Sequence, residues 1–222
     1  MPVSQTPPSM LDRLDRTHSR LREEHSALNF AAERSRISAC LSALYDISTC
    51  SGGCRGGDHM FEYLCGRAFN LSYAAYDLLQ IGLYDEAFNQ LRSLGELVNL
   101  VTLCMSDNAA FKNWVQADHK ERLKRFGPAQ VRKLIIASDG PLIVNSDLYS
   151  QLCELATHVT PTTAPNRHNE TGNTHVGGSV QADGYASGLR LLEDLLFFAA
   201  TGFAAFVGDT HTVDSLVKLS PT

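Results

Sequence analysis

Apolar residues recur at helical spacing along most of the sequence. In the region 10–48, Met10, Leu14, Leu21 and Leu28 follow one another at intervals of four and seven residues. We find no clear run in which apolar and polar residues alternate, which is the pattern of a half-buried strand. This restricts the chain to all-α folds, and 222 residues suffice for one domain with a substantial core. We therefore predict a single-domain helical bundle.

Turn-forming residues divide this pattern into segments. The glycine-rich stretch CSGGCRGGD at 50–58 ends the first helical region, while Gly82 and Gly127-Pro128 end later ones. The polar stretch 159–184 has no periodicity, and we expect a long irregular loop there before the last helix. The remaining predicted helices cover 58–80, 87–105, 109–126, 129–138, 146–158 and 185–207.

The two ends of the chain differ from the region between them. Residues 1–9 are rich in proline and serine and are predicted to be a disordered tail, and residues 208–222 a polar C-terminal tail. The helical bundle domain then spans 10–207. The N-terminal residues lack the features of a signal peptide, and the apolar run 195–207 is too short to cross a bilayer. Six cysteines without a signal peptide favour reduced thiols, so we expect a cytoplasmic protein without membrane contact.

The segment LRSLGELVNLVTL, 91–103, places an arginine and a glutamate in an otherwise apolar helix. With Arg92 at zero on a helical wheel, Glu96 falls at about 40°. Asn89 and Asn99 lie on the same side, and the rest of the circumference is apolar. A buried ion needs a partner, and Arg92 and Glu96 can pair as i and i+4. This polar stripe is either a structural ion pair at a helix contact or the lining of a functional pocket.

The same helix carries a resemblance to a known group of proteins. LYDEAFNQLRSLGELVNLV (83–101), followed by YSQLCELATHVTP (149–161) and a final apolar helix, resembles bacterial, mostly uncharacterised proteins related to the HEPN superfamily. The resemblance covers about 58–207. It implies an all-helical, dimeric protein and, as for some HEPN proteins, a metal-independent ribonuclease of a toxin–antitoxin or phage-defence system. Its motif positions, and the implied site, are Arg92, Glu96, His158 and Pro161, of which Arg92, Glu96 and His158 would be catalytic.

The ribonucleases of this superfamily carry the motif Arg-x(4–6)-His. Two pairs in this sequence match it, Arg13…His18 and Arg20…His25. Both lie in the first helical region, whereas the family normally places the motif near the final helix. We keep Arg20 and His25 as an alternative catalytic pair, and the other interpretation is a solvated face of a charge-rich helix.

Further polar residues are candidates for ligand binding. His158 lies at the end of a predicted helix, where the helix dipole favours histidine, and it could also act as a general acid or base. His168 and His175 lie in the long loop and could close over the polar stripe, to which Asn99 also belongs. The segment 120–133 is strongly basic although the net charge of the chain is −5. Its candidate residues for binding RNA or an acidic protein are Lys120, Arg122, Lys124 and Arg125.

A cysteine and histidine pattern frames the glycine-rich stretch. Cys50, Cys54, His59 and Cys65 offer the ligand types of a zinc site, but not the usual paired CxxC spacing. We therefore predict no cofactor, with zinc as the weaker alternative to a flexible loop and buried thiols.

Two functional hypotheses follow. The first is a HEPN-like effector acting on RNA through Arg92, Glu96 and His158. The second is a non-catalytic helical binding or regulatory module that acts through protein–protein contacts, with the loop 159–184 binding the partner. Small residues in the predicted final helix suit either the core or the interface of a homodimer.

Overall fold

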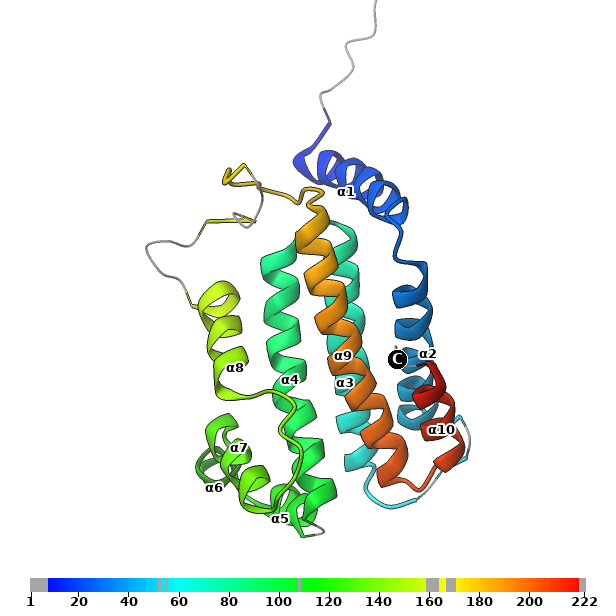
Figure 1. Ribbon diagram of the computed structural model, residues 1–222, viewed down its shortest axis with the longest axis vertical. Helices are drawn as coiled ribbons and strands as arrows, with labels where there is room; N and C mark the ends of the chain where they lie inside the picture. Colours follow the sequence, from blue (N-terminus) through cyan, green and yellow to red (C-terminus); the bar gives the residue numbers. More distant parts are fainter. Residues whose placement is uncertain are drawn as a thin grey trace, which may run out of the picture.

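The computed structural model describes residues 8–51, 53–54, 56–107, 109–158, 164–166 and 171–219. Within these ranges every regular element is a helix, which confirms the all-α single-domain prediction (Figure 1). The elements are α1 Met10–Ser26, α2 Ala31–Ser48, α3 Met60–Gln80, α4 Tyr84–Ser106, α5 Ala110–Gln116, α6 His119–Phe126, α7 Pro128–Ala137, α8 Ser146–Leu152, the π-helix η1 Cys153–Thr157, α9 Ala182–Phe206 and α10 Thr210–Leu219.

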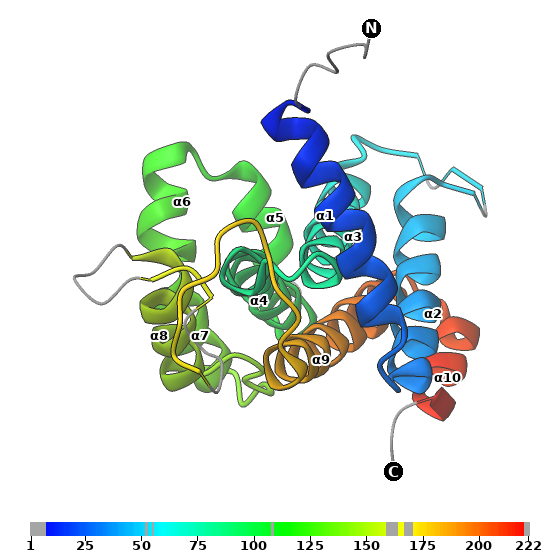
Figure 2. The same cartoon turned by 90° about the horizontal axis from the view of Figure 1, so that it is seen from above.

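Four long helices, α2, α3, α4 and α9, pack side by side around the main core (Figures 1 and 2). Small residues allow α9 to approach its neighbours closely. A Cβ atom at Gly188 would lie 2.5 Å from Leu79 of α3, and one at Gly202 would lie 3.0 Å from Val101 of α4. The small residues of α9 therefore serve packing within the chain, and Ala199, among others, is fully buried there.

A second layer lies against the outer side of α4. It consists of α5, α6, α7 and α8, which Figure 2 shows on the side of α4 away from α2. Leu100 and Leu103 of α4 meet Val131 and Ile135 of α7 in a separate small core. The main core covers one side of α4 and the small core covers the other. This explains why most of the circumference of α4 is apolar.

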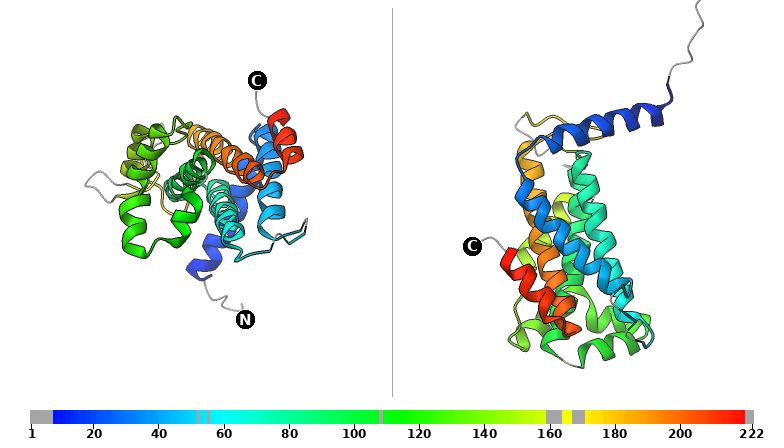
Figure 3. Two further views of the ribbon diagram at one scale, coloured as in Figure 1. Left: turned by 90° about the horizontal axis from the view of Figure 1, so that it is seen from below. Right: turned by 90° about the vertical axis from the view of Figure 1, so that its right-hand side faces the viewer.

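The interpretation of 208–222 as a polar tail is wrong for residues 210–219. These residues form α10, which packs against α2 and α9 (Figure 3). Asp209 accepts a hydrogen bond from the N–H of Thr212 at 3.0 Å, and Leu216 is buried in the main core. The helical start signal and the spacing of Val213 and Leu216 were present in the sequence, but only one residue of the helix is buried.

Two predicted helical regions are interrupted. The region 10–48 breaks after Ser26, so that α1 lies across one end of the bundle (Figure 3). The region 109–126 breaks at Asp118, whose carboxylate accepts the N–H of Glu121 at 2.8 Å and caps α6. Polar N-cap residues compete with helix continuation, and the sequence pattern alone does not show which of the two prevails.

The described part of the long loop packs onto the turn between α3 and α4. A Cβ atom at Gly82 would lie 2.0 Å from Ser179 O, and one at Gly178 would lie 2.0 Å from Ile81 O. Two backbones can approach this closely only where glycine removes the side chain. Asn166 also donates to Gly82 O, at 2.5 Å. The prediction of an irregular loop holds for the described residues up to Gln181, whereas 182–184 already belong to α9. The described loop residues cover an end of the bundle.

No helix in the described ranges has the length and apolar character needed to span a membrane.

Candidate functional site

The polar stripe of α4 is the line along which η1, α8 and the segment before α8 dock. Near one end, Thr157 of η1 donates to Asn89 Oδ1 at 3.0 Å. At the other, Asn99 Nδ2 donates to Val144 O at 2.8 Å and Asn99 Oδ1 accepts from Val144 N at 3.0 Å. Gly95 permits this contact, because a Cβ atom there would lie 2.9 Å from Val144 Cγ2. Asn99 is therefore a buried clamp on a backbone segment.

Arg92 and Glu96 form the centre of the stripe, as the sequence pattern predicts. Arg92 Nη2 lies 2.8 Å from Glu96 Oε1. Tyr149 of α8 joins both groups, since its hydroxyl accepts from Arg92 Nη2 at 2.5 Å and donates to Glu96 Oε1 at 2.8 Å. Arg92 Nε donates to Cys153 Sγ at 3.0 Å. The arginine thus fastens both α8 and η1 to α4.

The electrostatics of this network favour its present protonation states. Burial, followed by the interaction with Glu96, raises the pKa of Tyr149 to about 12, so the phenol stays protonated at neutral pH. Burial opposes the charge of Arg92, but contacts with Cys153, Glu96 and Tyr149 outweigh it and raise the pKa. The side chains of Arg92 and Glu96 keep 20% and 32% of their surface exposed. The pair therefore lies at a partly open seam between helices.

Glu96 also borders an open hollow of about 320 Å³ between α3, α4 and α7. Arg67 and Ser93 bring polar groups to it, and Phe126 and Val131 are among its apolar residues. Through this hollow, solvent reaches the network at Glu96.

His158 lies at the end of η1. Its backbone N–H donates to Cys153 O at 2.9 Å, and its side chain is exposed. It follows Thr157, which contacts Asn89 of the stripe. The proposed triad of Arg92, Glu96 and His158 thus combines a tightly bonded pair with an exposed histidine on the docked π-helix. Pro161 lies outside the described residues.

The alternative pair of Arg20 and His25 is divided between two environments. Arg20 is exposed and pairs with Glu24 on the same helix. His25 is completely buried, and its ring bonds Leu21 O at 2.8 Å and the hydroxyl of Tyr84 at 2.7 Å. Burial lowers the pKa of His25, which favours the neutral ring. This histidine ties α1 to the bundle.

Of the two loop histidines, one lies within the described residues and the other does not. His168 lies outside the described residues. His175 is half-buried, and its backbone N–H donates to Pro165 O at 3.0 Å within the loop. Whether either closes over the polar stripe stays a prediction.

The basic segment forms α6 and α7 at the edge of the molecule (Figure 2). The four predicted binding residues, Lys120, Arg122, Lys124 and Arg125, are all exposed. Lys124 and Arg125 border an open hollow of about 410 Å³, whose lining includes Leu103, Phe126 and Leu134. The hollow thus joins two cations to a mixed lining, to which Asp107, Asn113 and Gln130 contribute polar groups.

The glycine-rich stretch brings together three of the four predicted zinc ligands, Cys50, Cys54 and His59. Cys65 is fully buried, and its thiol donates to Leu44 O at 3.4 Å. Cys65 therefore belongs to the contact between α2 and α3.

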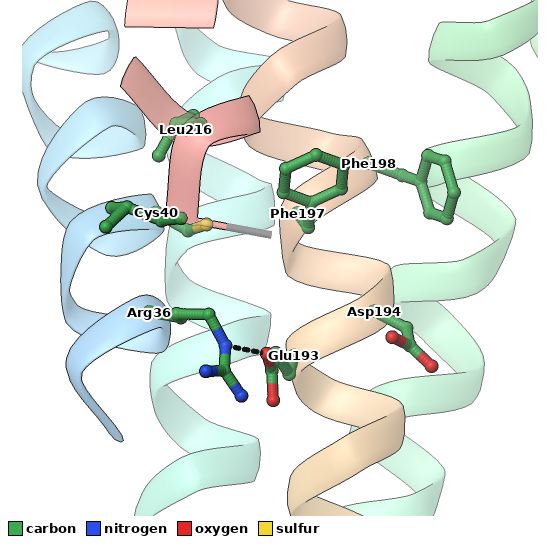
Figure 4. A pocket seen from close by; sticks show the side chains of 8 residues that line it. Arg36, Cys40, Glu193, Asp194, Phe197, Phe198 and Leu216 are labelled. Atoms are coloured by element: carbon green, nitrogen blue, oxygen red, sulfur yellow. Dashed lines mark hydrogen bonds and ion pairs between the residues drawn. The ribbon is translucent and has the colours of Figure 1, made fainter. Parts of the chain in front are cut away.

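A pocket of about 140 Å³ between α2, α9 and α10 was missed by sequence reasoning (Figure 4). Arg36 reaches across it from α2 to pair with Glu193 of α9. Burial raises the pKa of Cys40 to about 12, so this thiol is a poor nucleophile. Burial, and then Glu193, raises the pKa of Asp194. The pocket is smaller than usual ligand sites, which measure about 300–1,000 Å³. Leu216 and Leu219 of α10 complete the lining of this pocket, and our sequence prediction places both residues in a polar tail.

Comparison with known proteins adds no relative: no family model, curated protein or solved structure matches the chain.

Proposed function

We propose that this protein is a non-catalytic helical binding module that holds an acidic protein partner on the surface formed by α6 and α7. The observation that carries the proposal is the hollow of about 410 Å³ with Lys124 and Arg125 at its border. Leucine or phenylalanine side chains of a partner would enter the hollow, and neighbouring carboxylates would pair with the two cations.

Exposed apolar residues support a protein partner over a nucleic acid. Leu123 keeps 66% of its surface exposed, Leu134 42% and Ile136 64%, and all three belong to α6 or α7. Large exposed aliphatic residues among lysines and arginines suit a partner with acidic and apolar side chains. Sequence-tolerant RNA contacts depend more on cations and aromatic platforms.

The bonding of Arg92 supports a non-catalytic role for the polar stripe. Its Nε donates to Cys153, and its Nη2 contacts Glu96 and Tyr149, all within the chain. A catalytic arginine would need donors directed at the substrate. The HEPN resemblance, the homodimer and the cytoplasmic location stay predictions.

The test uses two labelled probes with the full-length protein. One is a short peptide of alternating glutamate and leucine, and the other is a single-stranded RNA oligonucleotide. We expect the peptide to bind with an affinity that falls as salt rises, because exposed charges are screened. The double variant Lys124→Glu, Arg125→Glu should weaken peptide binding by more than about tenfold.

The matched control reverses two exposed arginines on α1, Arg13→Glu and Arg16→Glu, and so makes the same change in net charge. Equal weakening by both double variants would overturn the α6–α7 site. If the RNA binds more tightly than the peptide, and its binding depends on Lys124 and Arg125, the partner of this surface would be RNA and not a protein. Cleavage of RNA that survives EDTA and is lost in His158→Ala would overturn the non-catalytic role.

A further inference from the structure

The connection between α2 and α3 gathers three side chains that bind soft metal ions. Cys50 lies just after α2, Cys54 lies in the connection, and His59 precedes the first residue of α3. One ligand atom from each, the two Sγ atoms and an imidazole nitrogen, lies within 4.8 Å of the other two. In a tetrahedral zinc site, ligand atoms are about 3.6–3.8 Å apart, given Zn–S distances of about 2.3 Å. The cluster is therefore close to the required geometry.

The backbone of the connection directs these side chains toward one another. Cys50 and His59 have φ angles of 55° and 56°, in the left-handed region that non-glycine residues rarely adopt. Gly53, Gly56 and Gly57 also have positive φ angles. The N–H of Gly56 points at Cys54 Sγ, at 3.4 Å. A thiolate accepts such a bond better than a thiol does, because it carries the charge.

A buried carboxylate lies beside the cluster, and its burial favours a cation at this place. Only 7% of the Glu62 side chain is exposed, and Glu62 Oε2 lies 4.0 Å from His59 Nδ1. That separation is too long for a hydrogen bond. Among the described residues, Glu62 forms no other ion pair. A buried carboxylate needs nearby positive charge, which a metal ion on His59 would supply.

We propose that Cys50, Cys54 and His59 bind Zn²⁺, with Glu62 as the outer partner that orients His59 and offsets the charge. Zinc suits this set because it binds thiolates and imidazole together in tetrahedral geometry. Binding converts two thiols into thiolates and releases two protons, so affinity falls as the pH falls. The fourth position takes a water molecule. This site is independent of the α6–α7 surface.

The position of the cluster gives the ion a structural task. It would link the end of α2 to the start of α3 across a connection rich in glycine, whose freedom in the unfolded chain is large. Zinc would therefore raise the melting temperature of the protein and reduce proteolysis between 50 and 59.

The experiment titrates the full-length, reduced protein with Co²⁺ and then with Zn²⁺ in competition with a chromophoric chelator. We expect a thiolate-to-cobalt charge-transfer band, visible bands of tetrahedral intensity, and displacement of cobalt by one zinc ion per chain. Cys54→Ser is the main variant, because Cys54 is exposed and its replacement leaves the core intact. It should weaken zinc binding more than Glu62→Gln does, for which the outer-partner role predicts about 10–100-fold. Cys104→Ala, at a buried cysteine on α4, is the matched control and should bind normally.

Three outcomes would overturn the proposal. The first is no cobalt spectrum and no zinc binding by the reduced, folded protein. The second is equal loss of binding in Cys104→Ala and Cys54→Ser. The third is a Cys50–Cys54 disulfide in protein purified under air, detected as a mass lower by two hydrogens, with no metal binding after its reduction.

Discussion

The polar stripe of α4 and the basic surface of α6 and α7 use charged residues in opposite ways. In the stripe, Arg92 and Asn99 bond to groups of other segments of the chain, and Asn99 is buried. On α6, Lys120 and Lys124 are exposed at the edge of the molecule. Burying a polar group costs free energy unless hydrogen bonds compensate, as they do in the stripe. Exposed charges affect stability little and are open to a partner.

The contrast is sharpest between two Arg–Glu pairs with the same i, i+4 spacing. Arg92–Glu96 is joined by Tyr149, with 20% and 32% of its side chains exposed. Arg20–Glu24 is exposed by 61% and 42%. Sequence spacing cannot distinguish the two pairs, but their surroundings make one a joint between helices and the other a surface contact.

The largest expected effect on stability comes from Asn99→Ala. It removes both side-chain bonds to Val144 and leaves two backbone groups unsatisfied in a buried contact. We expect the free energy of unfolding to fall by about 3 kcal/mol, measured by urea denaturation. Asn70→Ala, at an exposed site on α3, should leave it unchanged or slightly higher. Similar stability of both variants would contradict the clamp assigned to Asn99.

Arg92→Met ranks next, because it keeps an apolar stem but loses the bonds to Tyr149, Cys153 and Glu96. Allowing for the partial exposure, we expect a loss of about 1.5 kcal/mol in the free energy of unfolding. Arg20→Met should lose less than about 0.5 kcal/mol. The same urea experiment compares them. An equal, small loss in both would mean that the stripe is not a structural joint and would return it to the functional-pocket hypothesis.

The third prediction concerns pH. Burial lowers the pKa of His25 in the folded state, so the unfolded chain binds its proton first as the pH falls. Below about pH 6.5, the free energy of unfolding should therefore decrease, by at most about 1.4 kcal/mol per pH unit. Chemical denaturation between about pH 7 and pH 5.5 measures this slope. His25→Gln should flatten it, while His119→Gln, at an exposed position, should not. If the slope persists in His25→Gln, other titratable groups cause the pH dependence.

Much of the fold follows from helical periodicity, but the partners of the stripe do not. The spacing of Arg92, Glu96 and Asn99 predicts their common side. The groups that receive them, Tyr149 and Val144, lie some fifty residues farther along the chain. Such contacts depend on how helices pack, and local patterns do not record that.

The errors in the predicted elements have local causes. The sequence carries a start signal for α10 at Asp209 and apolar spacing at Val213 and Leu216, but the helix has only ten residues, so this local signal is short. The break before α6 depends on whether Asp118 caps a new helix or continues the old one. For the candidate sites, the sequence supplied the zinc ligand types, but only the fold separates Cys65 from the other three.

The smallest expected effect on stability comes from the exposed lysines of α6. Lys120 and Lys124 are one helical turn apart, and like charges at this spacing repel each other weakly. The double variant Lys120→Gln, Lys124→Gln should therefore leave the free energy of unfolding unchanged or raise it by less than about 0.5 kcal/mol, measured by urea denaturation alongside Arg92→Met. A loss comparable to that of Arg92→Met would mean that these lysines support the fold as the stripe does. A surface that leaves stability unchanged when its charges are removed has those charges available for a partner.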